Sequence, residues 1–208
     1  MNTLLSGKNA IVRSVLAASA GAPGIAEAHH FMDGGLPATF GQGILSGLAH
    51  PLIGLDHAVF IIVAGLLFAL VPKGLIGLLA LIAGSVVGAL LHLHGMIIPK
   101  AEVAIAGSVV IAAALLLIRP RIRMAWAAPV ALAAGAVHGY TYAETIFGAE
   151  TTPLVAYVLG FAAIQFAVGA AALVLHGYAL RHHPGRASFG RAAVSAVALA
   201  IGAVLLVY

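Results

Sequence analysis

The sequence contains no cysteine and few charged residues. The absence of cysteine excludes disulfide bonds, thiolate metal sites and iron–sulfur clusters, so histidine, methionine and carboxylate side chains must do any metal binding. Charged residues make up 8% of the chain, whereas a soluble domain carries roughly a quarter. A water-facing surface cannot be built from so few charges. The composition therefore predicts a protein of the lipid bilayer.

Three further absences narrow the function. The ten basic residues are scattered through short segments and form no stripe that could follow a phosphate backbone, which argues against nucleic-acid binding. The chain has no Gly-rich loop ending in Lys-Ser/Thr, so it cannot hydrolyse ATP itself. It also has no His-Glu-x-x-His sequence, which argues against an intramembrane metal hydrolase. We therefore expect no enzyme activity and no catalytic residues.

Hydrophobic residues make up 62% of the chain, and the mean hydropathy is +1.12. A helix needs about 20 apolar residues to cross a bilayer. Glycine and proline divide the chain into six approximate spans of that kind: 52–71, 74–93, 102–118, 124–141, 153–177 and 188–207. A shorter apolar segment, Phe40–Ala49, predicts either a re-entrant half-helix or the first part of a broken helix. The expected fold class is an all-α membrane protein of about six transmembrane helices with a broken or re-entrant first helix.

The N-terminal segment has the features of a cleavable signal peptide. Residues 1–28 combine Lys8 and Arg13 with a modest apolar run and end in Ala26-Glu27-Ala28, a small-x-small cleavage sequence. We predict cleavage after Ala28, which leaves residues 29–208 as a single polytopic transmembrane domain. The alternative is an uncleaved, disordered N-terminus.

The distribution of charge predicts the orientation. If the mature N-terminus lies outside, the inner loops hold seven basic residues and no acid: Lys73, Arg119, Arg121, Arg123, Arg181, Arg186 and Arg191. The outer loops hold Asp33, Glu102, Glu144 and Glu150 together with Lys100. Because positive charge is retained on the cytoplasmic side, we expect a multi-pass protein of the bacterial inner membrane with both mature termini in the periplasm.

This orientation brings most of the ionisable side chains to the outer ends of the spans. They are His50, Asp56, His57, His92, His94, Glu102, His138 and Glu144. Ionisable groups in or beside a membrane are costly to bury and are functional candidates by default. After cleavage the chain would begin with His29 and His30, which would form a metal-binding end in the periplasm.

The strongest local pattern extends from His50 to His57. Two imidazoles seven residues apart fall on roughly one face of a helix, but Pro51 and Gly54 should interrupt that helix. A broken helix at a membrane site exposes carbonyls and lets side chains converge on an ion. Imidazole suits Ni, Co, Cu and Zn, and Asp56 would offset part of the charge of a dication. The alternative is that Asp56 and His57 only cap the start of a helix.

The remaining candidates depend on where helices end. His92 and His94 would face opposite sides of a regular helix, so both can bind one ion only if the helix unwinds before Gly95. His138 and Glu144 share a site only if the end of their helix allows it. For His94 and His138 the alternative is a hydrogen bond to a neighbouring carbonyl.

Three segments resemble the HupE/UreJ family of nickel/cobalt permeases, which are associated with hydrogenases, ureases and cobalamin pathways. His50–His57 matches that family's His-x5-Asp-His signature, and Glu102–Val109 is similar to its Glu-led third span. His138–Glu144 resembles part of its second signature, although Tyr142 stands where a second histidine is expected. His92 or His94 would then compensate for the missing ligand.

The resemblance implies a secondary permease that imports Ni²⁺ or Co²⁺ as its cargo, without a permanent cofactor. It also implies a metallochaperone or a metalloenzyme maturation protein as a partner, besides the lipid bilayer. The alternative is a non-transporting accessory protein that holds metal for such a partner. A b-type haem protein is a further rival, but the outer position of the histidines and their acidic neighbours argue against it.

Overall fold

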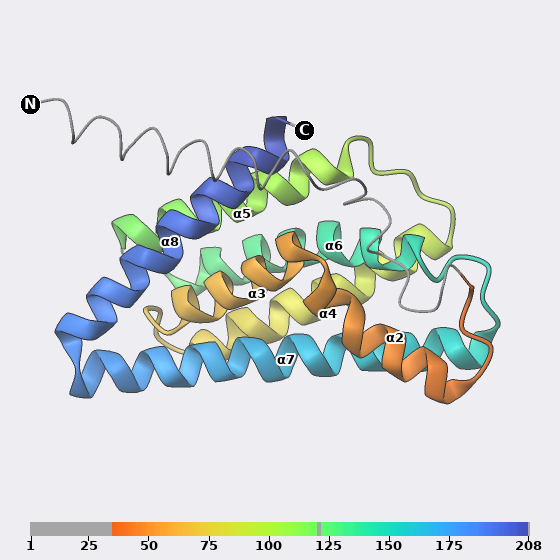
Figure 1. The fold of residues 1–208 in the computed structure, drawn as a ribbon, viewed down its shortest axis with the longest axis horizontal. Coiled ribbons are helices and arrows are strands. Elements are labelled where there is room, and N and C mark those ends of the chain that lie inside the picture. Colours follow the sequence, from red (N-terminus) through yellow and green to blue (C-terminus); the bar gives the residue numbers. More distant parts are fainter. Residues whose placement is uncertain (1–34, 120–121, 208) are drawn as a thin grey trace, which may run out of the picture.

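The computed structural model describes residues 35–119 and 122–207, where helices joined by short turns and loops form all of the regular secondary structure (Figure 1). Its helices are α2 (Phe40–Ile53), α3 (Leu55–Phe68), α4 (Gly74–Leu93), α5 (Ala101–Ile118), α6 (Met124–Glu144), α7 (Thr151–His182) and α8 (Pro184–Val207). The predicted signal peptide, its cleavage site and His29 and His30 lie outside the described residues. The all-α class is confirmed.

Four helices, α4, α5, α7 and α8, are long and apolar enough to cross a membrane, and the bent pair of α2 and α3 would be a fifth. Helix α6 covers the predicted span 124–141 but is not among them. Its last turns carry His138, Tyr140 and Thr141, which interrupt the apolar stretch that a span needs. The structure therefore supports four or five spans, and the sixth stays a prediction.

The first hydrophobic segment is broken, as predicted. Helices α2 and α3 meet at Gly54 with a bend of 78°, and Gly54 has extended backbone angles of φ −67° and ψ 106°. Pro51 does not end α2, because the chain stays helical to Ile53 and the Gly54 amide donates to the carbonyl of His50. Gly54 alone therefore forms the break between the two helices. Helix α2 also extends beyond the predicted Phe40–Ala49 segment.

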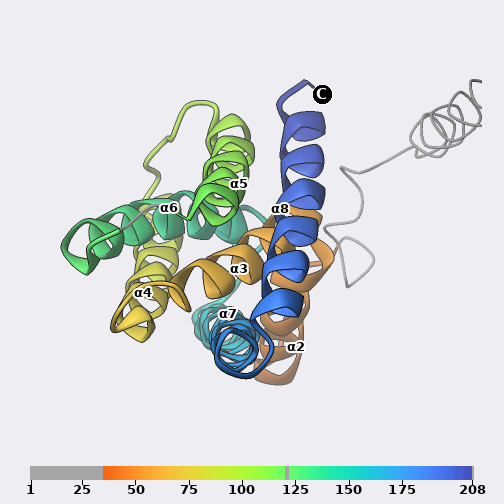
Figure 2. The same cartoon turned by 90° about the vertical axis from the view of Figure 1, so that its left-hand side faces the viewer.

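Helix α6 packs closely along α4, and α2 packs along α7 (Figure 2). Glycines make the first of these contacts possible. A Cβ on Gly139 would meet the backbone oxygen of Ser85, and a Cβ on Gly88 would meet that of Ala136. Small residues of this kind let membrane helices approach at the level of their backbones. The close approach fixes the depth of α6 against α4 and thereby the position of His138.

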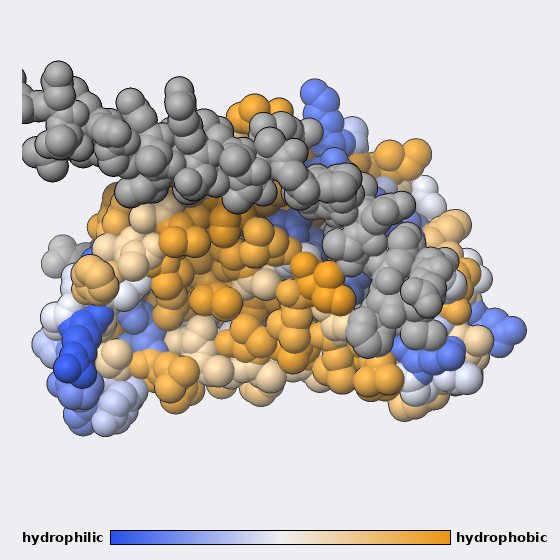
Figure 3. Space-filling model, in the orientation of Figure 1, coloured by the Kyte–Doolittle hydropathy of each residue, from blue (hydrophilic) through white to orange (hydrophobic). Residues whose placement is uncertain are grey.

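The surface agrees with a bilayer environment. Figure 3 shows hydrophobic residues over most of the middle of the visible face, with hydrophilic residues gathered mainly toward its two ends. Exposed hydrophobic side chains such as Ile111, Val174 and Leu175 are more than half exposed along the helices. In water such a surface would aggregate, whereas in lipid it is the expected exterior.

Candidate metal centre

Three histidines from three helices meet in the interior beside the bend. His50 lies in the last turn of α2, His57 in the first turn of α3 and His138 near the end of α6. Their exposed fractions are 7%, 2% and 1%, respectively. In a continuous helix, residues 50 and 57 would lie about 10 Å apart along the axis. Their ring centroids are 5.7 Å apart. The bend at Gly54 therefore brings the two rings together.

His57 and His138 are directly hydrogen-bonded. Their Nδ1 atoms lie 2.9 Å apart, so one ring donates and the other accepts. On the other side of His138, Nε2 lies 2.8 Å from Ser108 Oγ, and that hydroxyl donates its one proton to the carbonyl of Ile105. His138 must then donate through Nε2 and accept through Nδ1. His57 is consequently protonated at Nδ1, and its neutral form carries the lone pair on Nε2.

His50 is held by two hydroxyl groups. Its Nδ1 lies 2.8 Å from the Tyr157 hydroxyl and 3.1 Å from that of Thr145. Both hydroxyls donate to the carbonyl of Tyr142, which leaves their oxygens as acceptors for His50. His50 is therefore protonated at Nδ1, and its neutral form, like that of His57, carries the lone pair on Nε2.

The ring of Phe60 stacks on the imidazole of His138. Phe60 lies one helical turn beyond His57 on α3, and its ring stacks on the imidazole with a centroid distance of 4.1 Å and an interplanar angle of 15°. His138 is thus fixed by Ser108, His57 and Phe60 together. These three contacts preorganise the ring, which lowers the entropy cost of using it as a ligand.

Asp56 is the acid nearest to the cluster. Its Oδ1 accepts from the backbone amide of His57 at 2.8 Å and lies 3.9 Å from His57 Nδ1. The first contact joins adjacent residues inside the first turn of α3, whose N-cap is Gly54 and has no side-chain cap, so Asp56 does not cap the helix. His57 does not serve as a cap either, because its ring reaches His138. The carboxylate, 25% exposed, places a negative charge at the edge of the three imidazoles.

The other predicted ligands lie apart from this cluster. The His92 ring packs edge-on against Tyr140 and Phe147, with centroid distances of 4.5 Å and 5.5 Å. His94 is exposed and bonds to the carbonyl of Leu90, the alternative predicted for it. Glu102 and Glu144 are exposed at the ends of their helices. Across residues 35–119 and 122–207, no group of three or more His, Asp or Glu side chains is arranged to hold a metal ion.

A family model described as HupE / UreJ protein matches residues 16–205, nearly the whole chain. The chain belongs to the HupE/UreJ family. Separate comparisons with curated proteins and with solved structures found no match. The HupE/UreJ family is a membrane family associated with nickel and cobalt transport or with accessory roles. The predicted membership of this family is thereby confirmed.

Tyr142 occupies the position at which the HupE/UreJ signature suggests a second histidine. It is fully buried, and its ring lies edge-on to His50 and His57 at centroid distances of 5.2 Å and 4.5 Å. Its hydroxyl has no hydrogen-bond partner among the described residues. A buried polar atom without a partner costs about 1–3 kcal/mol and calls for an explanation such as a bound ion or water. Tyr142 therefore packs against the histidine cluster, at the position where the sequence led us to expect a second histidine.

The sequence predictions for this HupE/UreJ chain missed the residues that orient the histidines, notably Thr145 and Tyr157. One signal could have found Tyr157. It recurs at helical spacing with Phe161 and Gln165, and all three are buried on one face of α7. A polar residue within such a buried stripe marks an interior hydrogen bond. The contact between Ser108 and His138 follows only from how α5 packs against α6.

Proposed function

We propose that this protein is a secondary permease that imports a divalent transition metal ion, nickel or cobalt, across the bacterial inner membrane. The supporting observation is the meeting of three buried imidazoles from three helices at a broken membrane helix. Burying such groups in a bilayer is costly, and broken helices with inward-facing ligands are typical of transporter binding sites. Asp56 offsets part of the charge of the ion as it leaves water.

The spacing of the His57 and His138 nitrogens suits adjacent ligands of one ion. Their Nδ1 atoms lie 2.9 Å apart. With metal–nitrogen distances of about 2.1 Å, nitrogens at that spacing subtend about 90° at an ion, as in a square-planar or octahedral centre, whereas a tetrahedral ion such as zinc needs them about 3.4 Å apart. In the hydrogen bond the Nδ1–H bond and the Nδ1 lone pair point along the line between the two nitrogens, so both rings must turn before they face one ion. The spacing thus suits nickel or cobalt without choosing between them.

The position of one proton decides whether this pair can bind an ion. The Nδ1 proton of His57 lies between the two rings, and both Nδ1 atoms can bind the metal only after that proton has moved to Nε2 of His57. This change of tautomer releases no net proton, but protonation of either ring to an imidazolium would block the ion, so acid should oppose binding. His50, 5.7 Å away between ring centroids, joins the site by turning its ring or by a small change of the bend at Gly54. That movement completes the site, since no three-residue group is assembled beforehand.

Release to the inside requires the helices around Phe60 to separate. Its ring stacks on His138, and in the proposed orientation Phe60 comes after His57 on the way inward along α3. Alternating access in such bundles is mostly rigid-body movement of one group of helices against another. The bend between α2 and α3 is the natural hinge, because Gly54 already interrupts the helix there.

The test is uptake of labelled nickel and cobalt into liposomes that contain the purified protein. We expect His57→Ala and His138→Ala to abolish accumulation. His94→Ala is the matched control, because His94 is exposed and bonds only within its own helix in the described contacts; it should leave uptake unchanged. If the wild-type protein binds a metal but moves none, the accessory alternative replaces transport. If it binds neither metal, both are wrong.

A further inference from the structure

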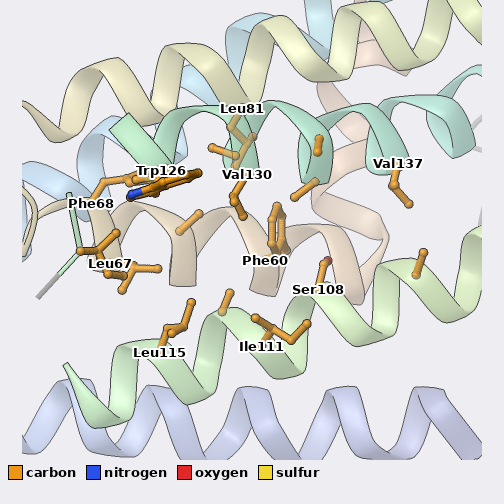
Figure 4. A pocket seen from close by; sticks show the side chains of 18 residues that line it. Phe60, Leu67, Phe68, Leu81, Ser108, Ile111, Leu115, Trp126, Val130 and Val137 are labelled. Carbon is orange, nitrogen blue, oxygen red and sulfur yellow. The ribbon is translucent and has the colours of Figure 1, made fainter. Parts of the chain in front are cut away.

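An apolar cavity of about 500 Å³ opens between α3, α5 and α6. Figure 4 shows the side chains around it, among them Phe60 and Leu67 from α3, Leu115 from α5 and Trp126 from α6. Among the residues that line it, Ser108 is the only one with a hydroxyl or a charged or amide side chain. Such a wall holds neither a metal ion nor water well, because it offers almost no hydrogen bonds. The occupant must be apolar.

The cavity is long and lies beside the bilayer. Its lining extends along α5 from Ala104 to Leu115 and along α6 from Trp126 to Val137, about 16 Å in each case at the rise of an α-helix. Ile111, Trp126 and Val130 at its wall are more than 60% exposed. The cavity, called the slot from here on, therefore opens toward lipid. Its length and width suit an extended hydrocarbon chain.

One end of the slot carries positive charge. Leu115 and Trp126 line the end where α5 finishes and α6 begins, and the exposed Arg119 and Arg123 flank that same turn. The carboxylates that the structure describes, Asp56, Glu102, Glu144 and Glu150, belong to the opposite ends of the helices. A ligand in the slot would contact apolar side chains along its length and the two arginines at its end, with none of the described carboxylates nearby.

We propose that this slot is a binding site for an anionic phospholipid, with one acyl chain between α5 and α6 and the phosphate at Arg119 and Arg123. Basic residues at the membrane surface favour anionic lipids by about fivefold each. The exposed Trp126 lies at the same end, where tryptophan is enriched at the headgroup level. A helix from a second copy of the chain would have no need of the two arginines. Charge and shape together therefore select the lipid.

The site would act on the metal centre through two shared residues. Ser108 and Phe60 line the slot between Trp126 and Val137 (Figure 4), and both contact His138. A chain in the slot would press on the ring of Phe60 and keep it stacked. Lipid binding itself does not depend on the proposed transport, so the two can be tested separately.

The chain has one tryptophan, and Trp126 lines the slot, so its fluorescence reports occupancy. The purified protein is reconstituted in zwitterionic lipid that contains a fixed fraction of either brominated phosphatidylglycerol or brominated phosphatidylcholine. We expect the anionic lipid to quench Trp126 more strongly. Arg119→Gln and Arg123→Gln should each lower that preference about fivefold and leave quenching by the zwitterionic lipid unchanged.

A second pair of variants tests the slot. Ala134→Phe fills it from a half-buried position and should remove the preference for the anionic lipid. Ala167→Phe adds the same side chain to an exposed position of α7, away from the residues that line the slot, and should not change it. Equal quenching by the two lipids in the wild-type protein would overturn the proposal. So would an anionic preference that survives both arginine variants, or one that Ala134→Phe leaves intact.

Discussion

His57 and His138 come from helices that are far apart in the chain, yet their Nδ1 atoms share a hydrogen bond of 2.9 Å. The proton in that bond belongs to His57, because Ser108 obliges His138 to donate through its other nitrogen. The one proton between the two Nδ1 atoms therefore prevents both of them from binding a metal ion at the same time.

Nickel affinity should fall as the pH is lowered, because an imidazolium ring at this pair cannot bind the ion. At a pH at which both rings are neutral, binding should release no net proton, since the Nδ1 proton of His57 only moves to Nε2. Calorimetric titration in two buffers of different ionisation enthalpy measures the number of protons released at each pH. A wild-type protein that binds nickel equally well in acid and in neutral solution would contradict this coupling.

Ser108→Ala should weaken metal binding about 10- to 100-fold, the usual effect of losing a group that orients a histidine ligand. The substitution removes the acceptor of the His138 Nε2 proton, so the ring is no longer held in one tautomer. Ser195→Ala is the control, since Ser195 is a buried serine and its hydroxyl has no partner among the described residues. Binding isotherms that are the same for both variants would show that Ser108 does not orient the ring.

The two buried tyrosines should respond differently to loss of the hydroxyl. Tyr157→Phe removes contacts to His50 and to the Tyr142 carbonyl and should lower the free energy of unfolding by about 1–2 kcal/mol. Tyr142→Phe loses no hydrogen bond seen in the described residues and should be neutral or stabilising without metal. Thermal unfolding in detergent compares them. A Tyr142→Phe protein as unstable as Tyr157→Phe would mean that the Tyr142 hydroxyl has a partner in the folded protein.

Gly139→Ala should destabilise the protein although alanine is normally the better residue in a helix. The new Cβ would meet the backbone oxygen of Ser85 and push α6 away from α4, at a cost of about 1–3 kcal/mol. Gly107→Ala is the control, because its Cβ would point into open space; it should be neutral or slightly stabilising. Metal affinity should fall only in the first variant, since His138 precedes Gly139 directly.

Much of the architecture could be predicted because glycine, proline and basic residues separate the apolar runs. Helix α4 begins and ends where the sequence predicts, at 74 and 93. The place of the break was predicted less well. Both Pro51 and Gly54 were expected to interrupt the helix, but a proline near the end of a helix can be accommodated within its last turn, so only Gly54 does so.

The candidate site was predicted in part. The local pattern of His50 and His57 suffices to place both at one site, because they flank a single break. The addition of His138, and the exclusion of His92 from the contacts made by these histidines, depend on how α6 packs on α4 through Gly88 and Gly139. Packing of helices distant in sequence leaves no local pattern. The orienting contacts of Ser108 and Tyr157 have the same origin.

Helix α6 carries His138 but is not among the four helices that are long and apolar enough to cross a membrane. During synthesis, such a segment partitions poorly into lipid when it emerges alone. Its partner along the glycine contacts, α4, is made earlier and is strongly apolar. We therefore expect α6 to enter the bilayer together with α4, so that the polar residues around His138 make its insertion depend on this contact. Substitutions that loosen this contact would reduce the amount of correctly inserted protein before they affected any bound ion.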